Sequence, residues 1–282
     1  MKIKGQINSG LQLLLAVFVA LFIGAGVSDA QEPTWWGSSS WFDWSDFRGS
    51  ANARLYFARF VSGSIKKNGI EYDLKSSPFS MGSDPQVIRE AWFELYVDRL
   101  GLRLLIQDHQ FTGKRAPGES ISHLDFGAIR VGLDLDLVRY PFFRSGIDFD
   151  YSMEAAKFND RSGNSEVVFS SAQPMTIGLH ATAIPGRVRD IPIIIEARAR
   201  GPIPFYKQSP NAKVIDWEVS GGLRPSVWQT SLYGYSTFAF GIEGGFRSLQ
   251  LNMDIDPDVS GLSQASIKAN WQGAFVQLGV SF

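Results

Sequence analysis

The chain has 282 residues, enough for one large domain or two small ones. Its formal net charge of −1 at pH 7 argues against a nucleic-acid partner and against a basic patch for membrane surfaces. Its 28 glycines and 13% aromatic residues suit a β-rich chain with many turns, and the lack of cysteine excludes disulfides, thiol chemistry and a lipid-modified cysteine.

The first 30 residues have the pattern of a secretory signal peptide. A short basic start is followed by a continuous apolar segment, and Ser28 and Ala30 supply the small residues of a cleavage site before Gln31. A retained N-terminal anchor is the alternative. The sequence beyond this segment has no apolar run near the ~20 residues that a spanning helix needs, so a mature chain that crosses a membrane must do so as a β-barrel.

Residues 31–50 form a tryptophan-rich lead-in without a clear period, containing Trp35, Trp36, Trp41 and Trp44. Indole side chains favour membrane–water interfaces. Two interpretations stay open: an interfacial segment, or a poorly ordered lead-in that packs on the rim of the following domain.

From residue 51 to the C-terminus, apolar and polar residues alternate in long segments. The clearest is "AIRVGLDLDLV" at residues 128–138, where alternate side chains would point to opposite faces of a strand. About ten strands are predicted, at residues 51–62, 87–98, 101–111, 123–137, 144–156, 167–183, 191–200, 213–224, 232–253 and 264–282. Eight or twelve strands stay possible, since an even number is expected.

These segments predict an all-β fold, an antiparallel transmembrane β-barrel at residues 51–282. The strands reach the ~9–11 residues needed to cross a bilayer at a tilt. Short and long connections alternate, aromatic residues cluster beside the short ones, and the last residue belongs to a strand, as barrel closure requires. A secreted soluble β-sandwich is the alternative, because it also buries one apolar face.

Two segments fit the alternation less well. The first strand, "RLYFARFV", is apolar on both faces and carries Arg59. The ninth changes phase, because Phe240 and Ile242 have one parity while Leu249 and Leu251 have the other. A glycine bulge at residues 244–245, or emergence of the strand above the bilayer, would explain this change.

The C-terminal segment "QGAFVQLGVSF" places Leu278, Val280 and the terminal Phe282 on one face. It resembles the assembly signal of Gram-negative outer-membrane β-barrel proteins. The last two strands are similar to the closing hairpin of small barrels of this class, although Gln272 and Gly273 stand where Gly-Pro is usual. The resemblance implies an outer-membrane location. It also implies the barrel-assembly machinery as a partner during biogenesis, and contact with outer-membrane lipids and lipopolysaccharide. No specific family is indicated.

Many charged residues share the face that would line the lumen: Glu90, Glu94, Arg103, Arg130, Asp134, Asp136, Asp148, Asp150, Glu154, Glu196, Arg198, Arg200, Asp216 and Glu218. Carboxylate pairs can perform acid–base catalysis. In a small barrel such residues more often form a charged network that fills a narrow lumen. We expect arginines from a neighbouring strand to neutralise Asp148 and Asp150.

Three histidines are available for chemistry. His109 and His123 flank one predicted outer loop, with Ser122 beside His123, so a Ser/His arrangement at the barrel rim is a catalytic hypothesis. Such an arrangement resembles outer-membrane lipid A deacylases and phospholipases. The third, His180, is predicted to face inward on its strand.

No phosphate-binding loop, dinucleotide fingerprint or zinc pattern appears, so neither a cofactor nor a metal is expected. The leading hypothesis is a non-enzymatic integral outer-membrane barrel, either a narrow porin-like pore or a structural or binding protein. A lipid- or peptide-hydrolysing barrel enzyme is the alternative.

Overall fold

The computed structural model describes residues 47–67, 70–76, 81–82, 85–113, 123–140, 142–159, 166–172, 174–203, 212–224, 226–230, 236–254 and 265–281. The predicted signal peptide, most of the tryptophan-rich lead-in, Ser122 and Phe282 lie outside these ranges. The predicted barrel boundary at residue 51 falls inside the first strand, which begins at Phe47.

The elements of the described chain are all β-strands. They are β1 (Phe47–Lys67), β2 (Ile70–Asp73), β3 (Gln86–Val97), β4 (Leu100–Thr112), β5 (His123–Tyr140), β6 (Phe143–Asn159), β7 (Glu166–Ala172), β8 (Met175–Val188), β9 (Ile191–Pro202), β10 (Ala212–Leu223), β11 (Ser226–Thr230), β12 (Ser236–Asp254) and β13 (Ala265–Ser281). Within the described ranges, no helix is long and apolar enough to cross a membrane.

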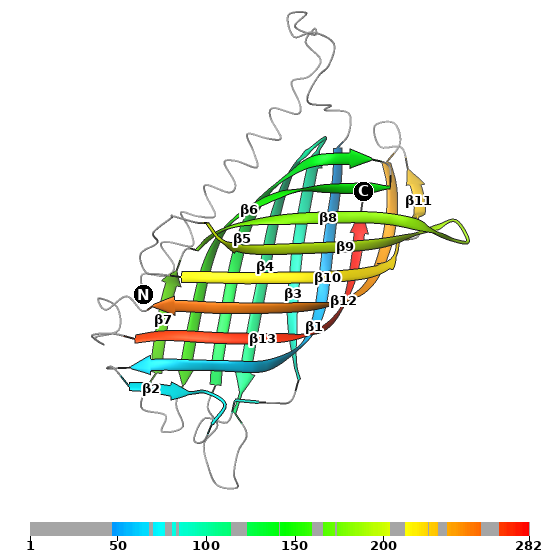
Figure 1. Cartoon of the computed structure of the whole chain (residues 1–282). Coiled ribbons are helices and arrows are strands. Elements are labelled where there is room, and N and C mark those ends of the chain that lie inside the picture. Colours follow the sequence, from blue (N-terminus) through cyan, green and yellow to red (C-terminus); the bar gives the residue numbers. More distant parts are fainter. Residues whose placement is uncertain are drawn as a thin grey trace, which may run out of the picture.

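Ten of these strands close into an antiparallel barrel. Their order is β10-β9-β8-β6-β5-β4-β3-β1-β13-β12, and pairing of β12 with β10 completes the ring. Short strands β2, β7 and β11 pair beside β1, β6 and β12. In Figure 1, β8, β9, β10, β12 and β13 cross in front of β3–β6 as opposite walls of the barrel. The prediction of an antiparallel barrel of about ten strands is confirmed, and the β-sandwich alternative is wrong because one sheet closes on itself.

The two ends of the barrel differ in their connections. Two-residue turns join β3 to β4 at Asp98–Arg99 and β8 to β9 at Arg189–Asp190. Asp98, Arg189 and Asp190 have positive φ (51°, 48° and 69°), the conformation that tight hairpin turns require. The first and last strands also meet here, since Ser50 pairs with Ser281. We call this the short-turn end, which lies at the upper right of Figure 1, and the opposite one the loop end.

Some strand boundaries differ from the prediction. The predicted strand 167–183 is two strands, β7 and β8, which pair with successive parts of β6. Proline lacks the N–H that a continuous strand would use, and here the carbonyl oxygen of Pro174 accepts hydrogen bonds from Ser152 N and Oγ at 3.0 and 3.1 Å. β1 is longer than predicted, 21 residues, with a register shift between Phe60 and Ser62.

The polarity of both barrel faces inverts partway along the strands, as β12 shows. Toward the short-turn end, Ile242 points outward and is 53% exposed, while the inward Arg247 is 1% exposed. Toward the loop end, the inward residue is Leu249, which is fully buried, and the outward Gln250 is exposed. The barrel therefore has an apolar exterior in one part and an apolar interior in the other.

The same inversion occurs on the neighbouring strands at a matching level. On β13, the outward side chains change from the apolar Val276 to the polar Gln272, and the inward ones from Gln277 to the buried Trp271. Gln272 pairs with Ser248 of β12, where the exterior of that strand also becomes polar. We call this shared level the polarity boundary.

The polarity boundary explains both irregular segments of the sequence. The register of β12 with β10 and β13 runs without a shift through Gly244 and Gly245, so the predicted bulge is wrong. Leu249 and Leu251 keep the inward parity and pack in the barrel interior. The first strand is apolar on both faces because it crosses this boundary, with Tyr56 buried inside and Phe57 40% exposed outside.

Candidate functional site

The lumen between the short-turn end and the polarity boundary is filled by charged side chains. The predicted lumen residues that are buried there are Glu90, Arg103, Arg130, Asp134, Asp136, Asp148, Asp150, Glu154, Arg200 and Asp216. Glu94, Glu196 and Glu218 form ion pairs with inward-facing arginines, one of them Arg198. These four residues are more exposed to solvent than the buried group. These charges come from β3, β4, β5, β6, β9 and β10, so the closed ring brings them together.

Arg247 is the centre of one group of ion pairs. Its Nε and Nη2 bind both carboxylate oxygens of Asp216 at 2.8 and 2.7 Å, and its Nη1 contacts Glu90. Arg54 pairs with Glu90 at 3.3 Å, and Arg130 pairs with Asp216 at 2.7 Å. The carboxylates are thus shared between arginines of different strands, an arrangement that offsets the cost of burying charge.

A second group contains the aspartates of β6. Arg103 Nη2 donates to Asp150 at 2.6 Å, and Arg200 Nε lies 3.0 Å from the other oxygen of Asp150. Arg198 Nε lies 3.2 Å from Asp148. We expected these arginines on a strand adjacent to β6, which is wrong. They belong to β4 and β9, each one strand beyond the neighbours of β6, because long arginine side chains reach across the lumen.

His180 lies between two carboxylates. Its Nδ1 is 2.5 Å from Asp148 Oδ1 and its Nε2 is 2.9 Å from Asp136 Oδ1. An imidazolium donates from both ring nitrogens, so it is the form of His180 that two ionised carboxylates can bind at once. The ring thereby joins an aspartate of β5 to one of β6.

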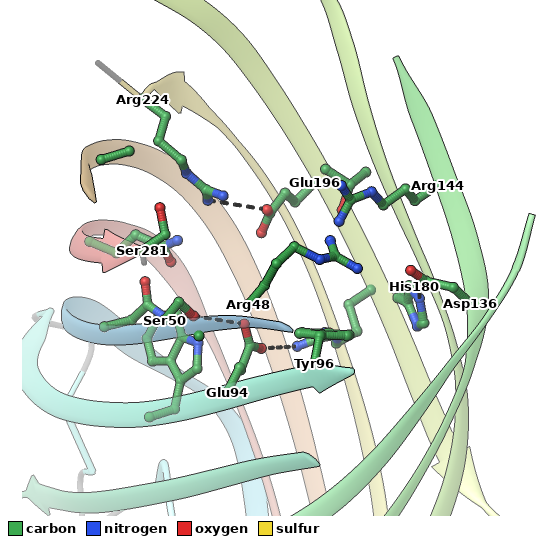
Figure 2. Close-up of a pocket in the computed structure, with 17 residues that line it drawn as sticks. Arg48, Ser50, Glu94, Tyr96, Asp136, Arg144, His180, Glu196, Arg224 and Ser281 are labelled. Atoms are coloured by element: carbon green, nitrogen blue, oxygen red, sulfur yellow. Dashed lines mark hydrogen bonds and ion pairs between the residues drawn. The ribbon is translucent and has the colours of Figure 1, made fainter. Parts of the chain in front are cut away.

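A cavity of about 540 Å³ opens from this network at the short-turn end. Figure 2 shows Arg48 of β1 and Arg144 of β6 extending into it. Its walls carry two ion pairs, Glu196–Arg224 and Glu94–Arg198. His180 and Asp136 also line it. The cavity carries both signs of charge on its walls and has the size of a small-molecule site.

The sequence interpretation missed several members of this site. Arg54 and Arg247 were not included in the lumen set, and neither was the Arg224–Glu243 pair at 2.8 Å. Arg54 was hidden in the segment that is apolar on both faces. Arg247 has the same parity as the inward Leu249, so the register of β12 would have identified it.

An apolar layer fills the lumen on the loop side of the network. Trp271, at its centre, packs edge-on or tilted against Phe126 and Phe111 at centroid distances of 5.4 Å. His109 lies 5.5 Å from Trp271 and from Phe126 and is fully buried. Among the described residues, this layer and the charged network together occupy the interior from one side of the polarity boundary to the other.

The two rim histidines do not converge. His109 faces inward, 3.4 Å from Glu90. His123 has outward parity on β5, since its inward neighbours Leu124 and Phe126 are buried. The two rings thus lie on opposite faces of the sheet, and the predicted approach of His109 to His123 is wrong. Within the described ranges, no group of three or more His, Asp or Glu residues is arranged to hold a metal ion.

No protein-family model and no curated protein sequence matches this chain. Three similar solved structures are the outer membrane protease OmpT from Escherichia coli, Neisserial surface protein A and the outer membrane protein AlkL. They are 11%, 9% and 11% identical, with TM-scores of 0.37, 0.30 and 0.30. They cover 83%, 83% and 90% of this chain, and 96%, 95% and 95% of the other chains. At this distance no activity is carried over, and no specific family is assigned.

Proposed function

We propose that the protein is an integral outer-membrane β-barrel with a closed lumen and a non-enzymatic structural or binding role. The observation that carries this proposal is the polarity boundary. On its short-turn side the exterior is apolar and the interior charged, as in a barrel surrounded by lipid. On its loop side the exterior is polar and the interior apolar, as in a barrel surrounded by water.

The exposed apolar side chains support insertion into a membrane. Leu179, Leu278 and Ile242 are 65%, 57% and 53% exposed and belong to three different strands. Tyr140 and Phe142, both exposed, stack at the short-turn end with ring centroids 5.9 Å apart, where interfacial aromatic residues are common. A water-soluble protein rarely leaves such an extended apolar surface uncovered.

Two layers in the described lumen support a closed barrel instead of a porin-like pore. The Arg247 group crosses the lumen, since Arg247 joins Asp216 of the adjacent β10 to Glu90 of β3, and Asp216 also pairs with Arg130 of β5. The Trp271 layer follows directly on the loop side. A binding role would use the cavity at the short-turn end, which faces the periplasm in an outer-membrane barrel.

The separation of His109 and His123 favours the non-enzymatic role over the hydrolase alternative. To act together as bases, both rings would have to reach one substrate, and rings on opposite faces of the sheet do not. His109 is instead enclosed by aromatic rings and Glu90.

Planar-bilayer recordings test the closed lumen. Protein purified in detergent is first shown to be folded by its heat-dependent shift in gel mobility, and is then added to a bilayer. We expect a folded protein without discrete conductance steps. Steps of constant size would overturn the closed lumen, whereas solubility without detergent would overturn membrane insertion itself.

A further inference from the structure

The exterior of the barrel has a basic, hollowed surface on the loop side of the polarity boundary. A hollow of about 330 Å³ lies over β1, β10, β12 and β13. Its side chains include two lysines, three amides and one isoleucine: Lys213, Lys268, Gln250, Asn252, Asn270 and Ile215. We call this the lysine hollow. Among its described lining residues there is no carboxylate.

The strand register fixes the arrangement of the two lysines. Asn252 of β12 pairs with Lys268 of β13 on one side and with Lys213 of β10 on the other. Adjacent strands are about 4.8 Å apart, so the two lysine backbones lie about 10 Å apart with the amide between them. Both lysines are exposed. Two ammonium groups and a side-chain amide donor can therefore approach one tetrahedral anion from three sides.

The lysine hollow adjoins the apolar exterior of the barrel. Ile215, 44% exposed, lines the side of the hollow nearest the short-turn end, and Trp217 lies two residues further in that direction. Trp217 packs against Phe246 with ring centroids 5.6 Å apart. A ligand that fills the hollow would thus have an anionic head group beside the lysines and apolar chains over these aromatic residues.

Both signs of charge surround the lysine hollow. Two further exposed cations, Arg59 and Lys66, lie on β1, and Lys66 pairs in register with the exposed Glu71 of β2. Asp254, also exposed, lies near the loop end of β12. Within its described lining, the hollow itself carries only positive charge.

We propose that the lysine hollow binds the phosphate group of an outer-leaflet lipid, the phosphorylated glycolipid lipopolysaccharide. Lys213 and Lys268 hold the phosphate, Asn252 donates a hydrogen bond to it, and the acyl chains lie along Ile215, Trp217 and Phe246. This inference rests on the proposed function, because it requires the loop end to face the outer leaflet.

The test compares binding of labelled lipopolysaccharide to the detergent-purified protein and to the double variant Lys213→Gln/Lys268→Gln. A cation beside an anionic lipid contributes about a fivefold factor in affinity, so we expect roughly 30-fold weaker binding for two. The control variant Lys75→Gln/Arg187→Gln removes the same charge from exposed positions outside the hollow and should bind as the wild type does. The heat-dependent gel shift confirms that each variant is folded, which keeps this test separate from that of membrane insertion.

Two ligand controls distinguish the source of the phosphate. Dephosphorylated lipopolysaccharide should bind wild type and double variant equally. Inorganic phosphate at millimolar concentration should compete poorly, because it lacks the acyl chains. Equal binding of intact lipopolysaccharide to wild type and double variant would overturn the proposal, and strong competition by inorganic phosphate would overturn the choice of a lipid.

Discussion

Replacing Arg247 with methionine tests whether the charged network holds the lumen together. Arg247 is 1% exposed and binds Asp216 through two nitrogens and Glu90 through a third. Methionine keeps most of the apolar stem and removes the charge. Both carboxylates stay buried, with Arg130 as a remaining partner of Asp216 at 2.7 Å and Arg54 as a remaining partner of Glu90 at 3.3 Å.

The magnitude follows from those remaining partners. Removal of one member of a buried ion pair typically costs about 3–5 kcal/mol, because the other charge loses its compensation. Here Asp216 keeps Arg130 and Arg200, and Glu90 keeps Arg54. We therefore expect the free energy of unfolding to fall by about 3 kcal/mol, at the lower end of that range.

The assay is urea unfolding in lipid vesicles, followed by gel mobility and tryptophan fluorescence. The control Arg187→Met removes an exposed arginine and should change the free energy of unfolding by less than about 0.5 kcal/mol. The double variant Arg247→Met/Glu90→Gln should lose less stability than the sum of its single variants, by about 1 kcal/mol or more, since the two residues are in contact. An Arg247→Met variant as stable as Arg187→Met would refute the network as a stabilising element.

Three further predictions concern the exterior, the apolar layer and the rim. Val276→Lys places a charge in the lipid-facing belt and should lower the free energy of unfolding in vesicles by about 2 kcal/mol or more. Its control Gln272→Lys lies on the loop side of the polarity boundary and should change that free energy little. Equal effects of the two substitutions would place the boundary elsewhere. Trp271→Ala should lower that free energy by about 3–5 kcal/mol through cavity formation, and an unchanged urea midpoint would contradict tight packing of the layer. The His109→Ala/His123→Ala variant should leave the lipid A and phospholipid profiles of the membrane unchanged, and an altered profile on mass spectrometry would restore the hydrolase hypothesis.

The sequence by itself determined the strands and the faces of most of them. Alternate side chains point to opposite sides of a strand whatever the strand pairs with, so residues such as Asp134 and Asp148 could be assigned to the lumen from their parity. The same rule predicted the outward position of Leu278, which is 57% exposed. These conclusions depend on residues close together in the chain.

Only the tertiary structure decided which charges meet and where the faces invert. Arg54 pairs with Glu218, which is 164 residues away, and such contacts depend on the ring closure and on the register of every intervening strand. The polarity boundary is likewise a property of the assembled barrel, since a strand that crosses it looks irregular until its neighbours show the same change at the same level. The physical reason is that period-two alternation is local, whereas burial and ion pairing are set by distant strands.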